Sequence, residues 1–363
     1  MTAAALHVRA VLLPGEEERD LWVRDGALTF EPVPGARTVA RGGYALPGLV
    51  DAHCHVGLTP SGPALGDEPL AQAHTDRDTG ALLLRDCGSP VDTRFLLDRA
   101  DAPRLIRAGR HLARPKRYVR GLALEVEPDE LPDAVAEQAR YGGGWVKLVG
   151  DWIDRSVGDL TPLWPAGVLA EAVGRAHAAG ARVAVHTFGE EALADLVAAG
   201  VDSIEHGTGL TDDLVGAVAG PGIALVPTLI NTAENFLGIA ERADKYPSYA
   251  ARMRRLHRTA AGRVRAAHEA GVPIYVGTDA GGTMPHGQVA AEIRALHAAG
   301  LPAAAALAAG SWAARDWLGL PGLVEGAPAD LVVYDRDPRT DLSVLHTPAR
   351  IILRGRVVDP FVG

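Results

Sequence analysis

Strand-like and helical segments alternate between residues 49 and 319, and this alternation restricts the fold more than any other feature of the sequence. Helical patterns separate most of the apolar strands, and several of these helices end at an Ala-Gly pair, where glycine stops a helix in a left-handed conformation. Eight strands with helical crossovers in roughly 270 residues match an α/β fold of the (β/α)8 TIM barrel type, with a doubly wound open sheet as the alternative. The predicted strands are 49–55, 81–87, 104–108, 145–149, 182–186, 203–206, 224–227 and 274–278.

Both ends of the chain carry short extended segments without a helical pattern. We therefore predict a small composite β-sandwich domain formed by both termini, from residues 1–48 and 322–363, beside a barrel domain of residues 49–321. The terminal strands are predicted at 6–13, 21–23, 27–30, 330–334, 349–353 and 356–358.

The composition excludes several classes of protein. The chain has 36 lysine and arginine residues against 45 acidic ones, a formal net charge of −9. We therefore expect a small-molecule substrate, and neither a nucleic acid nor a membrane as a partner. The two cysteines, Cys54 and Cys87, indicate no disulfide framework. The apolar N-terminal run is interrupted by Arg9 and is too short for a signal peptide or a membrane span, so we expect a cytoplasmic protein.

Polar side chains stand at or near the ends of four predicted barrel strands, and a lysine lies within a fifth, the strand 145–149. Because the carboxyl ends of barrel strands meet at one mouth, these side chains are expected to converge there. The first strand alone carries His53 and His55, which project to the same side because side chains alternate along a strand. A lysine inside the apolar strand 145–149 should be either neutral or paired. The six candidate residues are His53, His55, Lys147, His186, His206 and Asp279.

The order His-x-His, Lys, His, His, Asp resembles that of the amidohydrolase superfamily, metal-dependent hydrolases built on a distorted (β/α)8 barrel. Longer motifs are similar to its imidazolonepropionase-like and Xaa-Pro dipeptidase-like branch. The resemblance covers nearly the whole chain, and its motifs identify the superfamily without naming a substrate. The motifs are ALPGLVDAHCH at 45–55, HTFG at 186–189, IEHGT at 204–208, VPTL at 226–229, VGTDAGG at 276–282 and GAPADL at 326–331.

The resemblance implies a binuclear metal centre. His53, His55 and Asp279 would hold one divalent ion, and His186 and His206 would hold a second. Lys147 would bridge the two ions as a carbamate, formed from its neutral amine and carbon dioxide. Zn²⁺ suits imidazole ligands best, and Mn²⁺, Co²⁺ or Fe²⁺ would also fit the mixed nitrogen and oxygen ligands. The structural alternative for Lys147 is a side chain that extends out of the barrel into solvent.

The activity implied is hydrolysis of an amide-type C–N bond in a dipeptide, an N-acyl amino acid or a cyclic amide. The two ions would generate a bridging hydroxide, and Asp279 would act as the proton shuttle to the leaving nitrogen. Hydrolysis of a lactone, carbamate or phosphotriester, and deamination, would use nearly the same site. A non-catalytic metal-binding or small-molecule-binding protein is the alternative from another class. The resemblance is compatible with a homo-oligomer, but no stretch identifies an interface.

Substrate contacts are expected from the loops that follow the strands. Arg120 could pair a substrate carboxylate, although a solvated surface charge is the ordinary reading of a loop arginine. Trp152 and Phe188 could form an apolar floor, and His286 could orient the substrate or donate an outer hydrogen bond. The candidate contacts are Tyr118, Arg120, Asp151, Trp152, Arg155, Phe188, Asn231, Phe236, Thr283 and His286.

Overall fold

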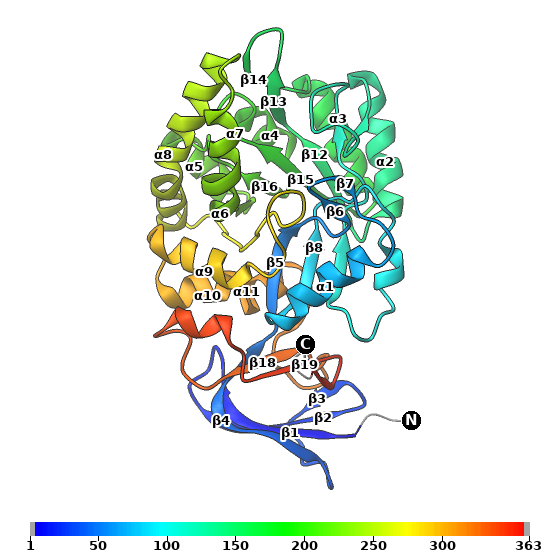
Figure 1. The fold of residues 1–363 in the computed structure, drawn as a ribbon, viewed down its shortest axis with the longest axis vertical. Helices are drawn as coiled ribbons and strands as arrows, with labels where there is room; N and C mark the ends of the chain where they lie inside the picture. The colour runs from blue at the N-terminus through cyan, green and yellow to red at the C-terminus, as the bar shows by residue number, and fades with distance from the viewer. Residues whose placement is uncertain (1–3, 359–363) are drawn as a thin grey trace.

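The computed structural model describes residues 4–358. A part rich in helices and parallel strands lies above a sheet that contains strands from both ends of the chain (Figure 1). The architecture is a mixed α/β, TIM-barrel-like fold, as predicted.

Parallel strands form two sheets in the upper part. The first has the order β5-β8-β9 and the second the order β11-β10-β12-β15-β16-β17. Seven of the eight predicted strands are thereby confirmed to within two residues at either end. Their bounds are β5 Leu49–Cys54, β8 Ala81–Asp86, β9 Arg104–Arg107, β12 Trp145–Val149, β15 Arg182–Thr187, β16 Ser203–His206 and β17 Ala224–Val226; the short β10 and β11 span Leu112–Ala113 and Leu124–Glu125.

The eighth predicted strand is an extended segment with isolated bridges rather than a regular strand. Its backbone binds β5 on one side, through Ala52 N to Val276 O at 2.8 Å, and β17 on the other, through Tyr275 N to Leu225 O at 3.0 Å. A Cβ on Gly277 would lie 2.5 Å from the Cβ of His53, so only glycine allows this approach. The segment therefore joins the two parallel sheets.

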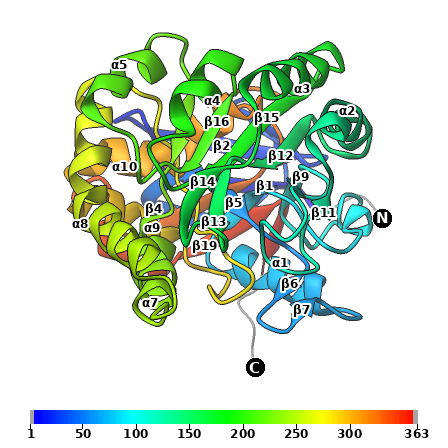
Figure 2. The same cartoon turned by 90° about the horizontal axis from the view of Figure 1, so that it is seen from above.

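The segment 104–113 connects the same two sheets on their other side. Its first half, β9, pairs with β8, and its second half, β10, pairs with β12 through Leu112 and Leu148. Viewed from above, helices lie around the strands (Figure 2). Closure into a complete barrel stays a prediction.

The helices predicted from the sequence at 168–179, 190–199, 249–270, 288–299 and 303–318 are present with shifted ends, and the last one is broken at Gly310 into α10 and α11. Gly180, Gly200 and Gly271 follow three helices with φ values of 75°, 76° and 81°, as their Ala-Gly pairs predicted. The helices are α1 Glu68–Asp78, α2 Leu131–Tyr141, α3 Ala166–Ala178, α4 Leu193–Ala199, α5 Asp212–Ala219, α6 Leu229–Asn231, α7 Leu237–Glu241, α8 Pro247–Glu269, α9 Val289–Ala298, α10 Ala303–Ala309 and α11 Trp312–Trp317.

The terminal strands form one seven-stranded sheet of order β20-β19-β18-β4-β1-β2-β3, so both ends of the chain contribute to it as predicted. The arrangement of these strands as a two-layered sandwich is not confirmed. The 11-residue strand β4, which the sequence analysis missed, leads directly toward β5. The bounds are β1 Leu6–Leu12, β2 Glu18–Arg24, β3 Ala27–Thr29, β4 Arg37–Pro47, β18 Leu331–Tyr334, β19 Arg350–Leu353 and β20 Arg356–Val358.

Strand β18 attaches the terminal sheet to the upper part. Leu331 and Val333 pack into the core of the terminal sheet, whereas Val332 and Tyr334 pack into the main core. This alternation follows the two-residue period of a strand, so one strand contributes to two cores. The terminal strands thus position the start of β5, where the first candidate site residues lie.

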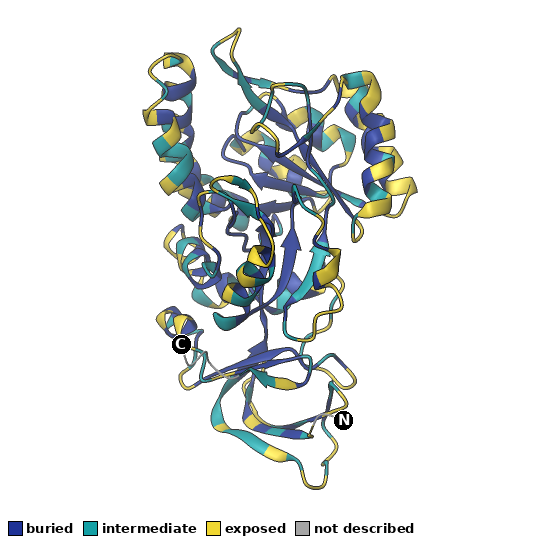
Figure 3. Ribbon diagram, turned by 45° about the vertical axis from the view of Figure 1, so that its right-hand side comes forward, coloured by how far each residue is buried: buried dark blue, intermediate teal, exposed yellow. Residues whose placement is uncertain are grey.

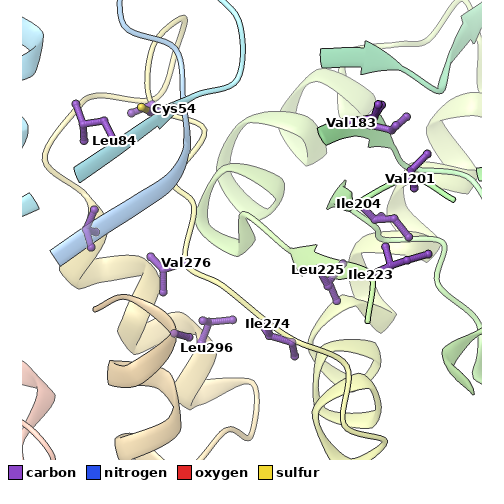
Figure 4. Close-up of a cluster of buried hydrophobic side chains, with 14 of the residues drawn as sticks. Cys54, Leu84, Val183, Val201, Ile204, Ile223, Leu225, Ile274, Val276 and Leu296 are labelled. Atoms are coloured by element: carbon purple, nitrogen blue, oxygen red, sulfur yellow. The ribbon is translucent and has the colours of Figure 1, made fainter. Parts of the chain in front are cut away.

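The main core lies between the parallel strands and their helices. Buried residues concentrate in the strands, and the outward helix faces are exposed (Figure 3). Side chains such as Ile204, Leu225, Ile274 and Val276 pack in one continuous cluster (Figure 4). No helix within residues 4–358 combines the length and the apolar character needed to cross a bilayer.

Two short hairpins extend from the loops above the strands. The first pairs β6 Leu58–Thr59 with β7 Gly62–Pro63, after β5. The second pairs β13 Asp151–Asp154 with β14 Asp159–Pro162, after β12. Both hairpins follow carboxyl ends of strands, the end at which a TIM-barrel enzyme carries its site.

Candidate metal centre

The imidazole rings of four predicted histidines lie close together at the carboxyl ends of the parallel strands. The ring of His53 lies 5.1 Å from that of His55 and 5.2 Å from that of His206, and His206 lies 4.6 Å from His186, measured between centroids. All four side chains are buried. Residues from β5, β15 and β16 thus meet where the sequence predicted a common mouth.

Asp279 completes this cluster from the segment that follows Ile274. Its Oδ1 lies 2.9 Å from Nε2 of His55 and 3.3 Å from Nε2 of His53. Its Oδ2 accepts a hydrogen bond of 2.5 Å from the amide of Asn231. Burial alone would raise the pKa of Asp279, but His53, His55 and His206 outweigh burial and hold that pKa well below its usual range. The carboxyl group is therefore an anion at neutral pH.

Three residues near the cluster have left-handed backbone conformations that are rare for residues other than glycine. They are His206, Thr228 and Asp279, with φ values of 65°, 46° and 57°. A left-handed residue interrupts strand alternation, which explains how the adjacent residues Glu205 and His206 both contact His53. Such strain persists where the surrounding structure holds it, as at functional sites.

Each of three cluster histidines is held through its Nδ1 atom. The Nδ1 of His53 lies 2.7 Å from Oε2 of Glu205, that of His55 lies 2.8 Å from the carbonyl oxygen of Gly88, and that of His206 lies 2.7 Å from Oγ1 of Thr228. A carboxylate or a carbonyl oxygen can only accept, so Nδ1 carries the proton in His53 and His55. The Nε2 atom of each ring faces Oδ1 of Asp279, so it is the atom available to a metal ion bound between these imidazoles and that carboxylate.

Glu205 belongs to a buried charge pair that the sequence analysis missed. Its Oε1 accepts a hydrogen bond of 2.8 Å from Arg85, and both side chains are fully buried. The guanidinium of Arg85 also lies over the ring of Trp145, 4.4 Å from its centroid. Burial would raise the pKa of Glu205, but Arg85 and the neighbouring cations hold it well below its usual range. An arginine inside the apolar strand 81–86 is the same signal that identified Lys147.

Several buried nitrogens within residues 4–358 have no hydrogen-bond partner. They include Nζ of Lys147, Nε2 of His186 and both ring nitrogens of His111. Lys147 is only 1% exposed, so its side chain does not extend into solvent. Burial lowers the pKa of His186 and of His206 well below the usual range, which keeps both imidazoles neutral, as metal ligation requires.

His111, which the sequence analysis left without a role, lies at the edge of the cluster. Its ring is 4.9 Å from that of His55 and 5.4 Å from that of Tyr118. Burial lowers its pKa well below the usual range. The sequence signal was its place directly before β10, near the end of the third strand segment.

Aromatic side chains border the cluster on the side of His186 and His206. Tyr118 and Trp152 lie 5.5 and 5.2 Å from the ring of His186, and Phe188 and Phe236 lie 5.0 and 5.4 Å from that of His206. We call these four residues the aromatic wall. All four were predicted substrate contacts, and the structure brings them beside the histidines.

The remaining predicted contacts are dispersed. Arg120 and Arg155 are exposed. Asp151 accepts hydrogen bonds from the backbone of Phe188 and Gly189, so it supports the loop after β15. His286 binds Asp76 through Nδ1 at 2.7 Å and, with Thr283, lines a separate cavity of about 470 Å³.

The donor set fits a divalent cation. Ligand atoms of His53, His206 and Asp279 all lie within 4.8 Å of one another, and unpaired nitrogens of Lys147 and His186 are nearby in the fold. A second set, His53, Cys87 and Glu205, meets the same distance limit. Glu205 is already bound to Arg85 and His53, so the first set is the better candidate.

Comparisons with known proteins agree with this geometry. An uncharacterized protein of Mycobacterium tuberculosis is 60% identical over 359 residues, covering 99% of this chain and 97% of that protein. The crystal structure of a putative prolidase from Bifidobacterium longum is 24% identical with a TM-score of 0.83, covering 99% of this chain and 95% of that one. A crystal structure of an Xaa-Pro dipeptidase with bound methionine in the active site is 21% identical with a TM-score of 0.82, covering 98% and 100%.

These two solved structures share the fold of this chain. The profile of the amidohydrolase family, whose members are hydrolases that generally use divalent metals, matches residues 44–358. That match includes both the parallel strands and the later strands of the terminal sheet. The chain therefore belongs to the amidohydrolase family.

Proposed function

We propose that this protein is a binuclear metal-dependent hydrolase that cleaves an amide-type C–N bond. The observation that carries the proposal is the burial of an anionic carboxylate, neutral imidazoles and an unpaired lysine around one point at the carboxyl ends of the strands. Buried polar atoms without partners are rare in proteins, and a metal centre would satisfy them together.

In this proposal His53, His55 and Asp279 would hold one ion, His186 and His206 would hold the second, and Lys147, as a carbamate, would be a ligand to both. Zinc is the metal that we expect, because most of the ligands are imidazoles. When bound, two divalent ions supply Lewis acidity and lower the pKa of a coordinated water.

For the fold, we propose a closed, distorted barrel of residues 49–321 and a sandwich-like domain of residues 1–48 and 322–363.

The residues of the chain then perform three tasks. Glu205, Gly88 and Thr228 hold three imidazoles in a fixed orientation. Asp279 accepts a proton from the attacking water and delivers it to the leaving nitrogen, because among residues 4–358 it is the one carboxylate that contacts both His53 and His55. His111 is placed to donate a hydrogen bond to the oxygen of the scissile group, because its ring nitrogens are unpaired beside His55.

The aromatic wall supports a substrate with an apolar or aromatic group next to the scissile bond. Its four rings present flat apolar faces beside His186 and His206, and such faces bind apolar groups. Because two structurally similar proteins are a prolidase and an Xaa-Pro dipeptidase, Xaa-Pro dipeptides with an apolar first residue are the first compounds to test.

The test compares the wild-type enzyme with Asp279→Asn on a panel of Xaa-Pro dipeptides, N-acyl amino acids and cyclic amides. Carbamates, lactones and phosphotriesters complete the panel. We expect Asp279→Asn to lower kcat by about 10²–10⁴-fold, because it removes the proton acceptor. The surface variant Asp101→Asn serves as the control. An Asp279→Asn enzyme with the wild-type rate would refute the proposed role.

A further inference from the structure

Glu292 carries a buried carboxyl group outside the candidate metal centre that no part of the proposed function uses. It lies on α9 and is 0% exposed. Within the described chain it has no ion-pair partner. Its two oxygens instead accept hydrogen bonds from backbone amides, Oε1 from Leu229 at 2.7 Å and Oε2 from Ile230 at 3.0 Å. Burying a carboxyl group without a cation is unfavourable, so this residue stabilises something specific.

The two amides open the short helix α6, which follows β17; we call Thr228 and the single helical turn α6 together the turn 228–231. Thr228 starts this turn with a φ of 46°, and a left-handed conformation is strained for a β-branched residue. The next two amides are the first of helix α6, so they have no acceptor within the helix and would otherwise be unsatisfied. Glu292 therefore holds the backbone of the turn from a different element of the fold.

The turn carries two side chains to the metal centre. Oγ1 of Thr228 lies 2.7 Å from Nδ1 of His206, and the amide of Asn231 donates to Oδ2 of Asp279 at 2.5 Å. The amide of Asn235 in turn donates to Oδ1 of Asn231 at 2.6 Å, which orients the Asn231 amide with its NH2 toward Asp279. The carboxyl group of Glu292 thus fixes the segment that contacts both a candidate metal ligand and the candidate proton shuttle.

We propose that Glu292 is a positioning residue for hydrolysis, acting through the turn 228–231 to hold Asn231 against Asp279. Asn231 was predicted from the sequence as a substrate contact. In this proposal its side-chain amide instead holds the carboxylate of Asp279. The inference rests on the proposed role of Asp279. It assigns no contact between Glu292 and substrate or metal.

The test uses Glu292→Gln in the metal-loaded enzyme. Glutamine keeps the volume but replaces one acceptor oxygen by an NH2 group, which faces a backbone N–H and cannot accept from it. We expect kcat to fall about 10–100-fold with KM changed less than about threefold, as for other residues that orient catalytic groups. Ile293→Val is the matched control, because Ile293 is equally buried on α9, packs against Gly310 and offers the amides of Leu229 and Ile230 no acceptor. Glu292→Asp, which is too short to reach both amides, replaces Glu292→Gln if that variant is insoluble.

A double-mutant cycle separates positioning from general stability. The fold decrease in kcat caused by Glu292→Gln should be at least about three times smaller in the Asn231→Ala background than in the wild type. The reason is that Asn231→Ala has already removed the connection to Asp279. Equal factors in both backgrounds, or a loss that Ile293→Val reproduces, would overturn the inference.

Hydrogen exchange tests the inference independently of activity. The amides of Leu229 and Ile230 should lose protection in Glu292→Gln and keep it in Ile293→Val. If the wild type hydrolyses none of the panel, the proposed function fails while this measurement still decides whether Glu292 holds the turn. Unchanged protection in Glu292→Gln would overturn the inference even if the enzyme is active.

Discussion

Replacing Glu205 by glutamine should damage both the fold and the metal centre. The Arg85–Glu205 pair is fully buried with its charged atoms 2.8 Å apart. At that distance, an effective dielectric constant of about 20 gives an attraction of about 6 kcal/mol. Glutamine retains one hydrogen bond but leaves the Arg85 charge uncompensated, and breaking one partner of a buried pair costs about 3–5 kcal/mol.

The same substitution should change the tautomer of His53. A carboxylate only accepts from Nδ1, whereas a glutamine that keeps its oxygen toward Arg85 presents its NH2 group to His53. Nδ1 would then have to accept, and the proton would move to Nε2, the atom proposed to bind metal. Loss of such an orienting partner lowers metal affinity by about 10–100-fold.

Two assays measure these effects separately. Urea unfolding of the metal-free protein should show the loss of about 3–5 kcal/mol, equivalent to a decrease in Tm of about 4–7 °C for a chain of this length. A zinc titration with a competing chelator should show the lower affinity. Wild-type stability together with wild-type zinc affinity would refute the reasoning about this buried pair.

Three further predictions concern other parts of the molecule. Lys147→Ala should reduce both the metal content and the activity, and bicarbonate should not restore them; two retained metals with full activity would exclude a carbamate bridge. Phe236→Ala should raise KM for substrates with an apolar group by about tenfold and leave small polar substrates unaffected, as loss of one apolar contact predicts; equal effects on both would remove Phe236 from the substrate site. Hydrogen bonding to Arg255 holds the pKa of Glu190 at about 2, below its usual 4.5, so this pair stabilises the fold above pH 4.5 and its contribution is lost as the pH falls toward 2. Glu190→Gln should therefore lower the free energy of unfolding by about 1–2 kcal/mol at pH 7 and by nothing measurable at pH 2. The value at pH 7 is smaller than the pKa shift alone implies, because the pair is partly exposed. A loss of stability that persists at pH 2 would contradict this assignment.

The arrangement of the parallel strands could be predicted because it depends on local patterns. Apolar runs and Ala-Gly helix ends located seven strands, and His53, His55, His186 and His206 could be placed because strand ends meet at one mouth. The eighth strand was predicted from an apolar run, but the structure has isolated bridges there. Gly277 approaches His53 too closely for a side chain, and such a contact is invisible in a local pattern.

The residues that support the site could not be located in this way. Glu205 is adjacent to His206, so strict strand alternation would place their side chains on opposite faces. The left-handed φ of His206 interrupts the strand, and alternation does not hold at this position. Glu292 lies in an ordinary helical pattern, and its partners are backbone amides 62 and 63 residues earlier in the chain. Contacts of this kind depend on the folded arrangement of elements rather than on residue spacing.

Arg85 shows where the sequence contained an unused signal. It stands in an apolar strand just as Lys147 does, and a buried cation in such a strand requires a partner. The same argument applied to both residues predicts a second buried network beside the candidate metal ligands.

Elemental analysis of the purified protein, reconstituted with zinc in the presence and absence of bicarbonate, tests the central claim most directly. The account predicts close to two metal ions per chain when bicarbonate is present and fewer when it is absent, because the carbamate on Lys147 bridges the two sites. A protein that binds no metal under either condition would contradict the account, and a single ion unaffected by bicarbonate would contradict the binuclear, carbamate-bridged centre.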